Sequence, residues 1–340
     1  MTETRPATKR SALLSILSIS TAMLAPLLFA TNASAQTAAA PYPTKAITLI
    51  TLTPAGGSLD ILARSIGSGL QRQMGQSVVV ESKVGAGGNI GAEALARANP
   101  DGYTIGMITV STHGINPSLY GSAMRFDAVK DFAPITIAAE LNNVVVVNAS
   151  LPINNIAELV AYAKARPGEL SFGSAGTGTS QHLAGELMNS VAGIKMTHVP
   201  YKGAAQAVPD LLTGRTQLMF VSIPDVIAHV KSGKLRAIGV TGTKRSGALP
   251  DVVPVAEQGY PSFKVTAWFG VAVPAATPPV IVARLHREIS TALAVPETQE
   301  RLAGLGLDLV STTPEQAGNF IRSEIELWGK LVKQSGAKLD

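Results

Sequence analysis

The chain has 340 residues, of which 46% are hydrophobic and 15% are charged, and its formal net charge is +5. This length suffices for one large or two medium domains, and this composition favours a substantial core over a disordered chain. The sequence contains no cysteine, which excludes disulfides, thiolate metal sites and a cysteine nucleophile.

The first 35 residues predict a secretory signal peptide. Three basic residues lie among the first ten, residues 11–30 are uncharged and mostly apolar, and Ala33-Ser34-Ala35 gives the small-residue pattern of a cleavage site. A membrane anchor is the alternative, because about 20 apolar residues can span a bilayer. Pro26 and the small residues after it favour cleavage after Ala35. The mature protein is therefore predicted to be soluble and to lie outside the cytoplasm.

Cleavage there removes Arg5, Lys9 and Arg10 together with Glu3, which lowers the formal net charge from +5 to +3. A mild positive balance suits a small anionic ligand. The sequence has no dense stripe of lysine and arginine with interleaved aromatic residues. Nucleic acid is therefore not an expected partner.

The first elements of the predicted mature chain alternate between strand and helix. Strands are predicted at residues 46–54, 77–82 and 103–111, and helices at residues 59–74 and after the glycine-rich turn at 83–91. This β-α-β-α-β order predicts a parallel sheet with right-handed crossovers and helices on both faces.

The alternation restarts after about residue 145, since residues 144–150 form a further buried strand by composition. Strands and helices then alternate to residue 242, another strand is predicted at 265–274, and amphipathic helices are predicted at 277–295 and 313–336. Two α/β units in one chain predict two lobes with a cleft between them. Ligands of open parallel sheets bind outside the carboxyl ends of the strands.

Three glycine-rich turns, at residues 53–60, 83–91 and 174–182, each end a predicted strand and open a helix. The first turn of a helix has N–H groups without intrahelical partners, and the helix dipole makes that end partly positive. Glycine lets the backbone approach a ligand closely. These turns predict a site that binds a carboxylate through backbone amides. A plain capped turn is the alternative for each, with Ser58, Asn89, and Thr179 or Ser180 as N-cap residues.

The more specific motifs for nucleotide binding and catalysis are absent, because their residues do not occur at the required spacing. No segment supplies G-x-x-x-x-G-K-[ST], position 90 is Ile where a dinucleotide fingerprint needs glycine, and Phe172 breaks a nucleophile elbow around Ser174. The histidines show no i+3 or i+4 pair, so a zinc helix motif is absent. A hydrolase would have to use Ser174 or Ser180 with His182, and no elbow motif supports it.

Other polar residues lie at neighbouring strand-to-helix junctions. His182 is equally compatible with a ligand contact and with helix packing. Lys202 is either an anion partner or a solvated loop charge, and Tyr201 could form a wall of the cleft. Asp225, close to Ser222, either favours a helix N-terminus or faces the cleft, where it could accept from a ligand donor or from Lys202.

Several longer stretches carry a family resemblance. They include PAGGSLDILAR, VVVESKVGAGGNIGAEALARANPDGYT, GSAGTGTSQHLAGELM, HVPYKGAAQAVPDLLTG and GKLRAIGVT, and they occur in one order over residues 42–340. In these stretches the chain resembles the Bug family (TctC-like) of periplasmic solute-binding proteins, the receptors of tripartite tricarboxylate transporters.

The resemblance implies a type II periplasmic-binding fold of the α/β class, with two α/β lobes, crossing hinge strands and a central cleft. Residues 42–142 and 268–340 would form lobe 1, and residues 143–267 would form lobe 2. The hinge would fall near residues 142–147 and 265–268. The lobes would close on a small carboxylate held by the loops at 55–60 and 174–180, often through ordered waters.

The resemblance also implies a periplasmic binding protein that is not an enzyme and has no cofactor or metal. Its expected partners are a small anionic metabolite and, transiently, membrane transporter subunits, and it is expected to be a monomer. A sensor that presents its closed state to a two-component sensor kinase is the alternative, and the sequence does not separate the two roles.

The resulting candidate ligand-binding residues are Ala55, Gly56, Gly57, Ser58, Asp60, Ser111, Thr112, Ser174, Gly176, Thr177, Gly178, Thr179, Ser180, His182, Tyr201, Lys202, Ser222 and Asp225. Asn142 and Trp268 join Ser111 and Thr112 as residues that could set ligand length. Relatives often carry an aromatic residue and extra prolines before the double glycine, whereas this chain has Thr51-Leu52-Thr53. That departure bears on ligand identity.

Overall fold

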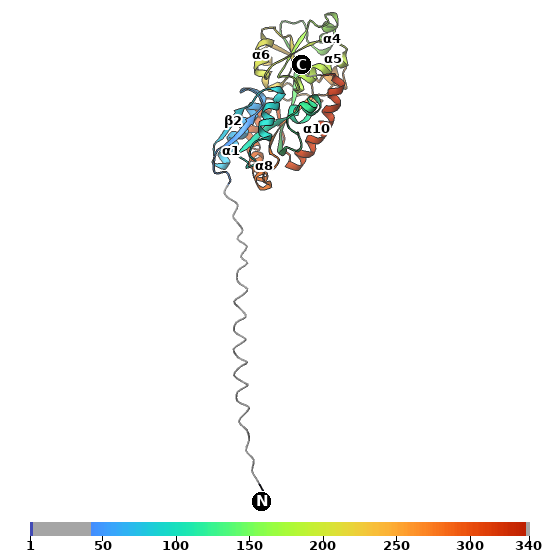
Figure 1. The fold of residues 1–340 in the computed structure, drawn as a ribbon. Helices are drawn as coiled ribbons and strands as arrows, with labels where there is room; N and C mark the ends of the chain where they lie inside the picture. The colour runs from blue at the N-terminus through green and yellow to red at the C-terminus, as the bar shows by residue number, and fades with distance from the viewer. Residues whose placement is uncertain (3–41, 338–340) are drawn as a thin grey trace. The chain divides into compact units, whose positions relative to one another are not determined.

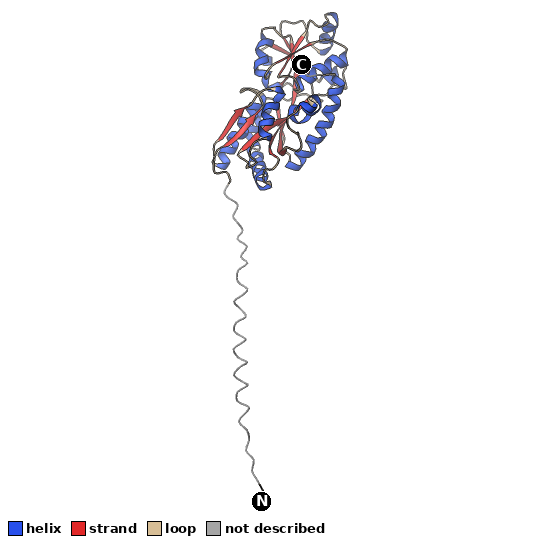
Figure 2. Ribbon diagram, in the orientation of Figure 1, coloured by secondary structure: helices blue, strands red, loops and turns tan. Residues whose placement is uncertain are grey.

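Residues 42–337 contain two groups of strands, each flanked by helices (Figures 1 and 2). The computed structural model describes residues 1–2 and 42–337. The predicted signal peptide therefore lies, apart from its first two residues, outside the described part. Residues from Pro43 onward form one compact unit.

The first group of elements precedes the long central strand. It comprises β1 (Ile47–Thr51), α1 (Ser58–Met74), β2 (Val78–Ser82), η1 (Ala86–Gly88), α2 (Asn89–Ala96), β3 (Thr104–Thr109), the π-helical η2 (Ser111–Ile115), α3 (Asn116–Leu119) and η3 (Gly121–Ala123). These elements agree with the strands and helices predicted before residue 111.

The remaining elements begin with the 17-residue strand β4 (Phe132–Asn148). They continue with α4 (Ile156–Ala165), β5 (Ser171–Ser174), α5 (Ser180–Ala192), β6 (Thr197–Pro200), α6 (Ala204–Leu212), β7 (Leu218–Ser222), α7 (Ile223–Lys231), β8 (Leu235–Val240), η4 (Val255–Gln258), β9 (Thr266–Pro274), α8 (Pro279–Leu293), α9 (Pro296–Ala303), β10 (Leu307–Leu309) and α10 (Pro314–Ser335).

The strands follow the order β2-β1-β3-β9-β4-β7-β5-β6, with β10 and β8 also paired to β4. The β2-β1-β3 and β6-β5-β7 segments are parallel, as the alternating sequence predicts. The strands β9, β4, β8 and β10 pair antiparallel to their neighbours. The sheet is mixed because the two connecting strands, β4 and β9, run against the strands they join.

Strand β4 belongs to both groups of strands. Its residues up to Asn142 pair with β9, and its residues from Asn143 onward pair with β7. The sequence pattern predicted only residues 144–150 of this strand. The preceding part contains Pro134 and two register shifts against β9, so it does not show the pattern of a regular strand.

Helix burial follows the apolar spacing of the sequence. Leu59, Leu62, Ile66 and Leu70 of α1 are buried. A second cluster, which includes Val144, Met219, Val221, Leu211 and Val226, joins β4 and β7 to α6 and α7. Each group of strands therefore has an apolar core on which its helices pack.

Helix α10 packs on η2, β4 and α5 (Figure 1). It is joined to β9 through one carboxylate, because Glu324 Oε2 accepts from Trp268 Nε1 at 2.7 Å and from Trp328 Nε1 at 2.8 Å. Thr313 and Gln316 form a capping box at the N-terminus of α10. The C-terminal helix is thus fixed both at its first turn and along its length.

A neutral histidine lies in the core beside η2. His113 is fully buried, and its ring packs edge-on against Phe132 with centroids 4.5 Å apart. Its Nδ1 lies 2.9 Å from Thr112 Oγ1. Burial lowers the pKa of His113 to about 3, so the side chain is uncharged at neutral pH.

Candidate ligand-binding site

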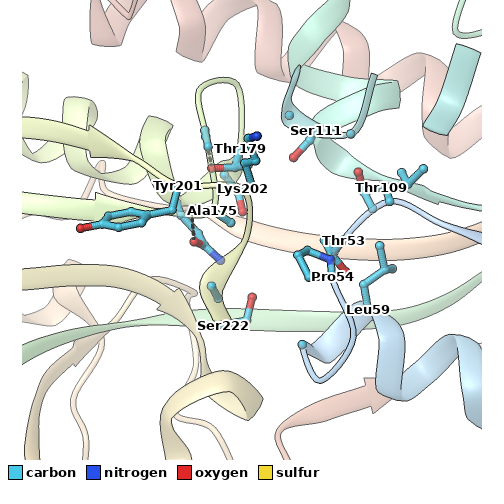
Figure 3. A pocket seen from close by; sticks show the side chains of 18 of the residues that line it. Thr53, Pro54, Leu59, Thr109, Ser111, Ala175, Thr179, Tyr201, Lys202 and Ser222 are labelled. Atoms are coloured by element: carbon cyan, nitrogen blue, oxygen red, sulfur yellow. Dashed lines mark hydrogen bonds between the residues drawn. The ribbon is translucent and has the colours of Figure 1, made fainter. Parts of the chain in front are cut away.

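A cavity of about 610 Å³ lies between the two groups of strands. Residues between 52 and 120 form one side of it, which we call the first wall, and residues between 175 and 225 form the opposite side, the second wall. Figure 3 shows Thr109 and Ser111 of the first wall facing Thr179 and Lys202 of the second. Ala267 and Phe269 of β9 complete the lining.

The N-terminus of α5 opens on the second wall. Thr179 is its N-cap residue, and the Thr179 hydroxyl accepts a hydrogen bond from His182 N. Among the described residues, no hydrogen bond is made by the backbone amides of Ser180 and Gln181, and both residues line the cavity. Two unpaired donors at the positive end of a 13-residue helix have the chemistry to bind an anion.

The loop before α5 is held by its own hydrogen bonds. Ala175 N donates to Gln181 Oε1 at 2.8 Å, Gly176 N to Ser174 Oγ at 3.0 Å, and Gly178 N to His182 Nδ1 at 3.3 Å. Gly176 and Gly178 have φ of +130° and +83°, a region that favours glycine. The loop therefore reaches the cavity with its shape already set.

Two stacked histidine rings lie behind this loop. The rings of His182 and His198 have centroids 4.1 Å apart, and His198 Nε2 lies 2.7 Å from Ser174 Oγ. Ser174 is fully buried and outside the cavity lining. The local serine–histidine pair is thus Ser174 with His198 and not with His182, and its position supports the loop instead of exposing a nucleophile.

The N-terminus of α1 opens on the first wall, and two carboxylates of the protein already bind its amides. Asp60 Oδ2 accepts from Gly56 N at 3.0 Å and from Arg64 Nε at 2.8 Å. Asp225, at the start of α7 on the second wall, accepts from Ser58 N at 2.8 Å. Burial raises the pKa of Asp225 to about 6, although hydrogen bonds from Ser58 act in the opposite direction.

The hydroxyls of the second wall are joined by one buried amide. Asn143 Nδ2 donates to Ser180 Oγ at 3.1 Å, and Ser222 Oγ donates to Asn143 Oδ1 at 3.3 Å. Asn143 is fully buried in β4, at the residue where that strand changes partners. The central strand thereby positions two hydroxyls of the cavity.

Apolar groups line much of the remainder. They are Leu52, Pro54, Leu59, Val110, Tyr120 and Phe269, to which several alanines and glycines add. Thr53 also lines the cavity, and its Oγ1 is buried without a hydrogen-bond partner. This hydroxyl oxygen is a polar group of the first wall that no described residue satisfies.

The polar end of Tyr201 does not face the cavity, whereas Lys202 is a lining residue. The Tyr201 ring points away from the space between the walls (Figure 3), and its hydroxyl donates to Asp210 Oδ2 at 2.8 Å. Burial, with the hydrogen bond to Asp210, raises the pKa of Tyr201 to about 12. Lys202 lines the cavity but is exposed.

The two walls meet around the cavity. A Cβ added to Gly87 would lie 2.6 Å from Thr177 O, and one added to Gly203 would lie 2.7 Å from Pro54 Cδ. A Cβ added to Gly178 would collide with Asn116 Oδ1. Glycines at these places let the walls approach each other more closely than other residues would.

Of the residues proposed from the sequence, eleven line this cavity and seven do not. The lining residues are Gly57, Ser58, Ser111, Gly176, Thr177, Thr179, Ser180, Tyr201, Lys202, Ser222 and Asp225; those outside the lining are Ala55, Gly56, Asp60, Thr112, Ser174, Gly178 and His182. Trp268 faces Glu324 instead. Thr179 is an N-cap as expected, whereas Gly57 and Gly88 cap the helices that Ser58 and Asn89 begin.

Several lining residues are not among those proposed from the sequence. They are chiefly Gly85 to Gly88, Thr109, Tyr120, Gln181, Ala267 and Phe269. The glycines among them belong to the turn at 83–91, which has the sequence pattern of a cradle. The alternation of a strand would have placed Ala267 and Phe269 on the face opposite to Trp268.

Comparison with known proteins agrees with this architecture. The family model described as the tripartite tricarboxylate transporter family receptor (TctC) matches residues 62–337. The protein BugT of Bordetella pertussis is 37% identical over 307 residues, which cover 90% of this chain and 94% of BugT.

Two solved structures are similar over nearly their whole length. The periplasmic binding protein BugD has a TM-score of 0.83 at 33% identity, over 87% of this chain and 99% of BugD. R. palustris Rpa4515 with adipate has a TM-score of 0.85 at 34% identity, over 88% of this chain and all of that chain.

The fold and the cavity define a two-lobed periplasmic solute-binding protein. The chain belongs to the TctC family of tripartite tricarboxylate transporter receptors. This is a family of binding receptors and not of enzymes. Within residues 1–2 and 42–337, no helix combines the length and apolarity needed to cross a membrane. The same residues contain no acidic or histidine cluster suited to a metal ion.

Proposed function

We propose that the protein captures a small carboxylate in this cavity and delivers it to a tripartite tricarboxylate-type transporter. The observation that carries the proposal is the pair of unpaired amides, Ser180 N and Gln181 N, at the cavity end of α5. A carboxylate bound there gains two charge-assisted hydrogen bonds and the favourable end of the helix dipole.

Capture follows from closing one lobe on the other. Residues 42–142 with 268–340 move as one lobe and residues 143–267 as the second, and the crossing strands β4 and β9 form the hinge. The carboxylate binds the second wall first, and closure brings the apolar and hydroxyl groups of the first wall onto the rest of the ligand. The closed form presents the surface that the membrane subunits recognise.

The neighbouring protein with adipate supports the choice of ligand class, because it is similar over 88% of this chain. The ligands considered are dicarboxylates, amino acids and aromatic acids. Within the described part of the chain, the lining contains no arginine, and its one lysine is exposed. Backbone amides, together with the hydroxyls of the walls, are therefore the donors available to a carboxylate buried away from solvent.

A pair of substitutions at Ser180 tests this role of the backbone. Ser180 is the first residue of α5, a position where proline is tolerated, and the preceding residue, Thr179, has the extended backbone (φ −85°, ψ 159°) that proline requires. Ser180→Pro removes the hydroxyl and the amide hydrogen, whereas Ser180→Ala removes only the hydroxyl.

Both variants are titrated by calorimetry with the acids that raise the melting temperature of the unmodified protein. Loss of one charge-assisted hydrogen bond, worth about 1.5–3 kcal/mol, should weaken binding about 10- to 150-fold in Ser180→Pro. Ser180→Ala should stay close to the unmodified protein. Equal affinities for the two variants, or an acid panel in which nothing binds, would contradict the proposal.

A further inference from the structure

Asp225 joins the two walls of the cavity by a direct hydrogen bond. Its carboxylate starts from α7 on the second wall and accepts from Ser58 N, the first amide of α1, at 2.8 Å. Asp225 is also a lining residue. The anion-binding end of α1 is therefore bound by an anion that the protein itself supplies.

A second negative charge has little to balance it at this end of the cavity. Asp60, the acidic residue of the first turn of α1, accepts from Gly56 and Arg64. The nearest basic lining residue, Lys202, is exposed to solvent. Among the described residues the lining holds no other lysine or arginine. A ligand carboxylate placed beside Asp225 would meet a like charge.

The surroundings of Asp225 disfavour a negative charge even when no ligand is bound. Burial is the main reason why the pKa of Asp225 rises to about 6, and no charged neighbour contributes to that shift. A ligand carboxylate at the same depth would lose solvation in the same way and would also be repelled by Asp225. A neutral group that donates a hydrogen bond would meet neither cost.

We infer that Asp225 makes the cavity selective for acids with a single carboxylate and a neutral, hydrogen-bond-donating far end, and that it excludes the corresponding dicarboxylates. The inference rests on the proposed function, since it takes the single carboxylate to be held by Ser180 and Gln181 at α5. The donor at the far end of the ligand then points toward Asp225 and α1.

Matched pairs of acids separate charge from size. Succinate, adipate and terephthalate are each compared with their monoamides, which keep the shape but carry one carboxylate and an N–H donor. Dissociation constants are measured by calorimetry at pH 7.5 for the unmodified protein, for Asp225→Asn and for Asp225→Ser. Asp251→Asn is the control, because Asp251 is exposed and outside the lining and its substitution removes the same charge.

The unmodified protein should bind the better-fitting monoamide at least tenfold more tightly than its diacid. Both Asp225 variants should shift the ratio toward the diacid by at least tenfold, and Asp251→Asn should leave the ratio unchanged. Two variants are used so that a folding defect in one, judged by circular dichroism, leaves the other to decide.

Two kinds of failure are distinguishable. A preference for the diacid in the unmodified protein, or a ratio that neither Asp225 variant changes, overturns the selectivity role while leaving carboxylate capture intact. Absence of binding by all six acids to every protein overturns the proposed function and this inference together.

Discussion

The substitution Gly178→Ala separates backbone strain from contact between the walls of the cavity. Gly178 has φ of +83°, and a Cβ there would collide with Asn116 Oδ1 and lie 3.1 Å from Tyr120 Cε2 on the first wall. Gly168 has the same φ of +83° and open space around it. Gly168→Ala is therefore a control with the same strain and no collision.

The strain is expected to be common to both variants. A left-handed backbone costs a residue with a Cβ about 1–2 kcal/mol. For a chain of this size that corresponds to a melting temperature lower by about 2–3 °C. Without ligand, when the lobes are free to separate, the two variants should lose similar stability.

The collision between the new Cβ at residue 178 and Asn116 destabilises the protein only when the two walls meet. Asn116 is fully buried, and its Nδ2 donates to Asn89 Oδ1 at 2.7 Å, so it has little room to withdraw. Overpacking of this kind costs about 1–3 kcal/mol, or about 5- to 150-fold in affinity.

Calorimetry with the tightest acid of the panel measures this loss. The dissociation constant should rise at least fivefold in Gly178→Ala and stay unchanged in Gly168→Ala. Equal affinities in the two variants would show that capture does not bring Gly178 against Asn116, and the proposed closure would then be wrong.

Three further predictions concern stability, each measured by denaturant unfolding. The pKa of Asp225 is raised from 3.8 to about 6, so its contribution to the free energy of unfolding is complete below pH 3.8 and is lost as the pH rises through 6. Asp225→Asn should therefore stabilise the protein by about 3 kcal/mol at pH 8 and not at pH 3.5. An equal effect at both pH values would refute this. The pKa of His113 is lowered from 6.5 to about 3, so the contribution of His113 to stability is complete above pH 6.5. Below pH 6.5 the free energy of unfolding falls by about 1.4 kcal/mol per pH unit. His113→Phe should flatten that decline, and an unchanged slope would contradict this role of His113. Gly185→Ala, whose Cβ would enter the ring of Phe172, should cost about 1–3 kcal/mol. Gly318→Ala in α10, whose Cβ would make only an ordinary contact with Arg322 Nη1 at 3.8 Å, should gain about 0.5–1 kcal/mol. The same sign for both variants would contradict the packing argument.

The local sequence pattern was sufficient to predict a helix or strand where that element packs on its neighbours in the sequence. The apolar stripe of α1 and the short parallel strands around it could be predicted because their periodicity is regular. The length of β4 could not, because Pro134 and the two register shifts interrupt its pattern. Its pairing partners also lie more than 70 residues away along the chain, at Ser222 and Thr266.

In the candidate site, too, local features could be predicted from the sequence and long-range contacts could not. The cap at Thr179 and the glycines before α5 are local features, and the sequence identified them. The bond between Ser58 and Asp225 joins residues 167 positions apart. The sequence offered Asp225 two roles, a helix N-terminus or the cleft, and the fold gives it both. Only the three-dimensional arrangement could reveal that the partner is the amide of another helix.

The carboxylate of Glu324 links the two fluorescent side chains of the protein, Trp268 and Trp328. The sequence contains two tryptophans, and both indole N–H groups donate to this one side chain. Trp268 sits between Ala267 and Phe269, which both line the cavity. A ligand in the cavity is therefore expected to change the surroundings of Trp268, and a change in the intrinsic tryptophan emission on adding the acids of the panel would report binding without a label.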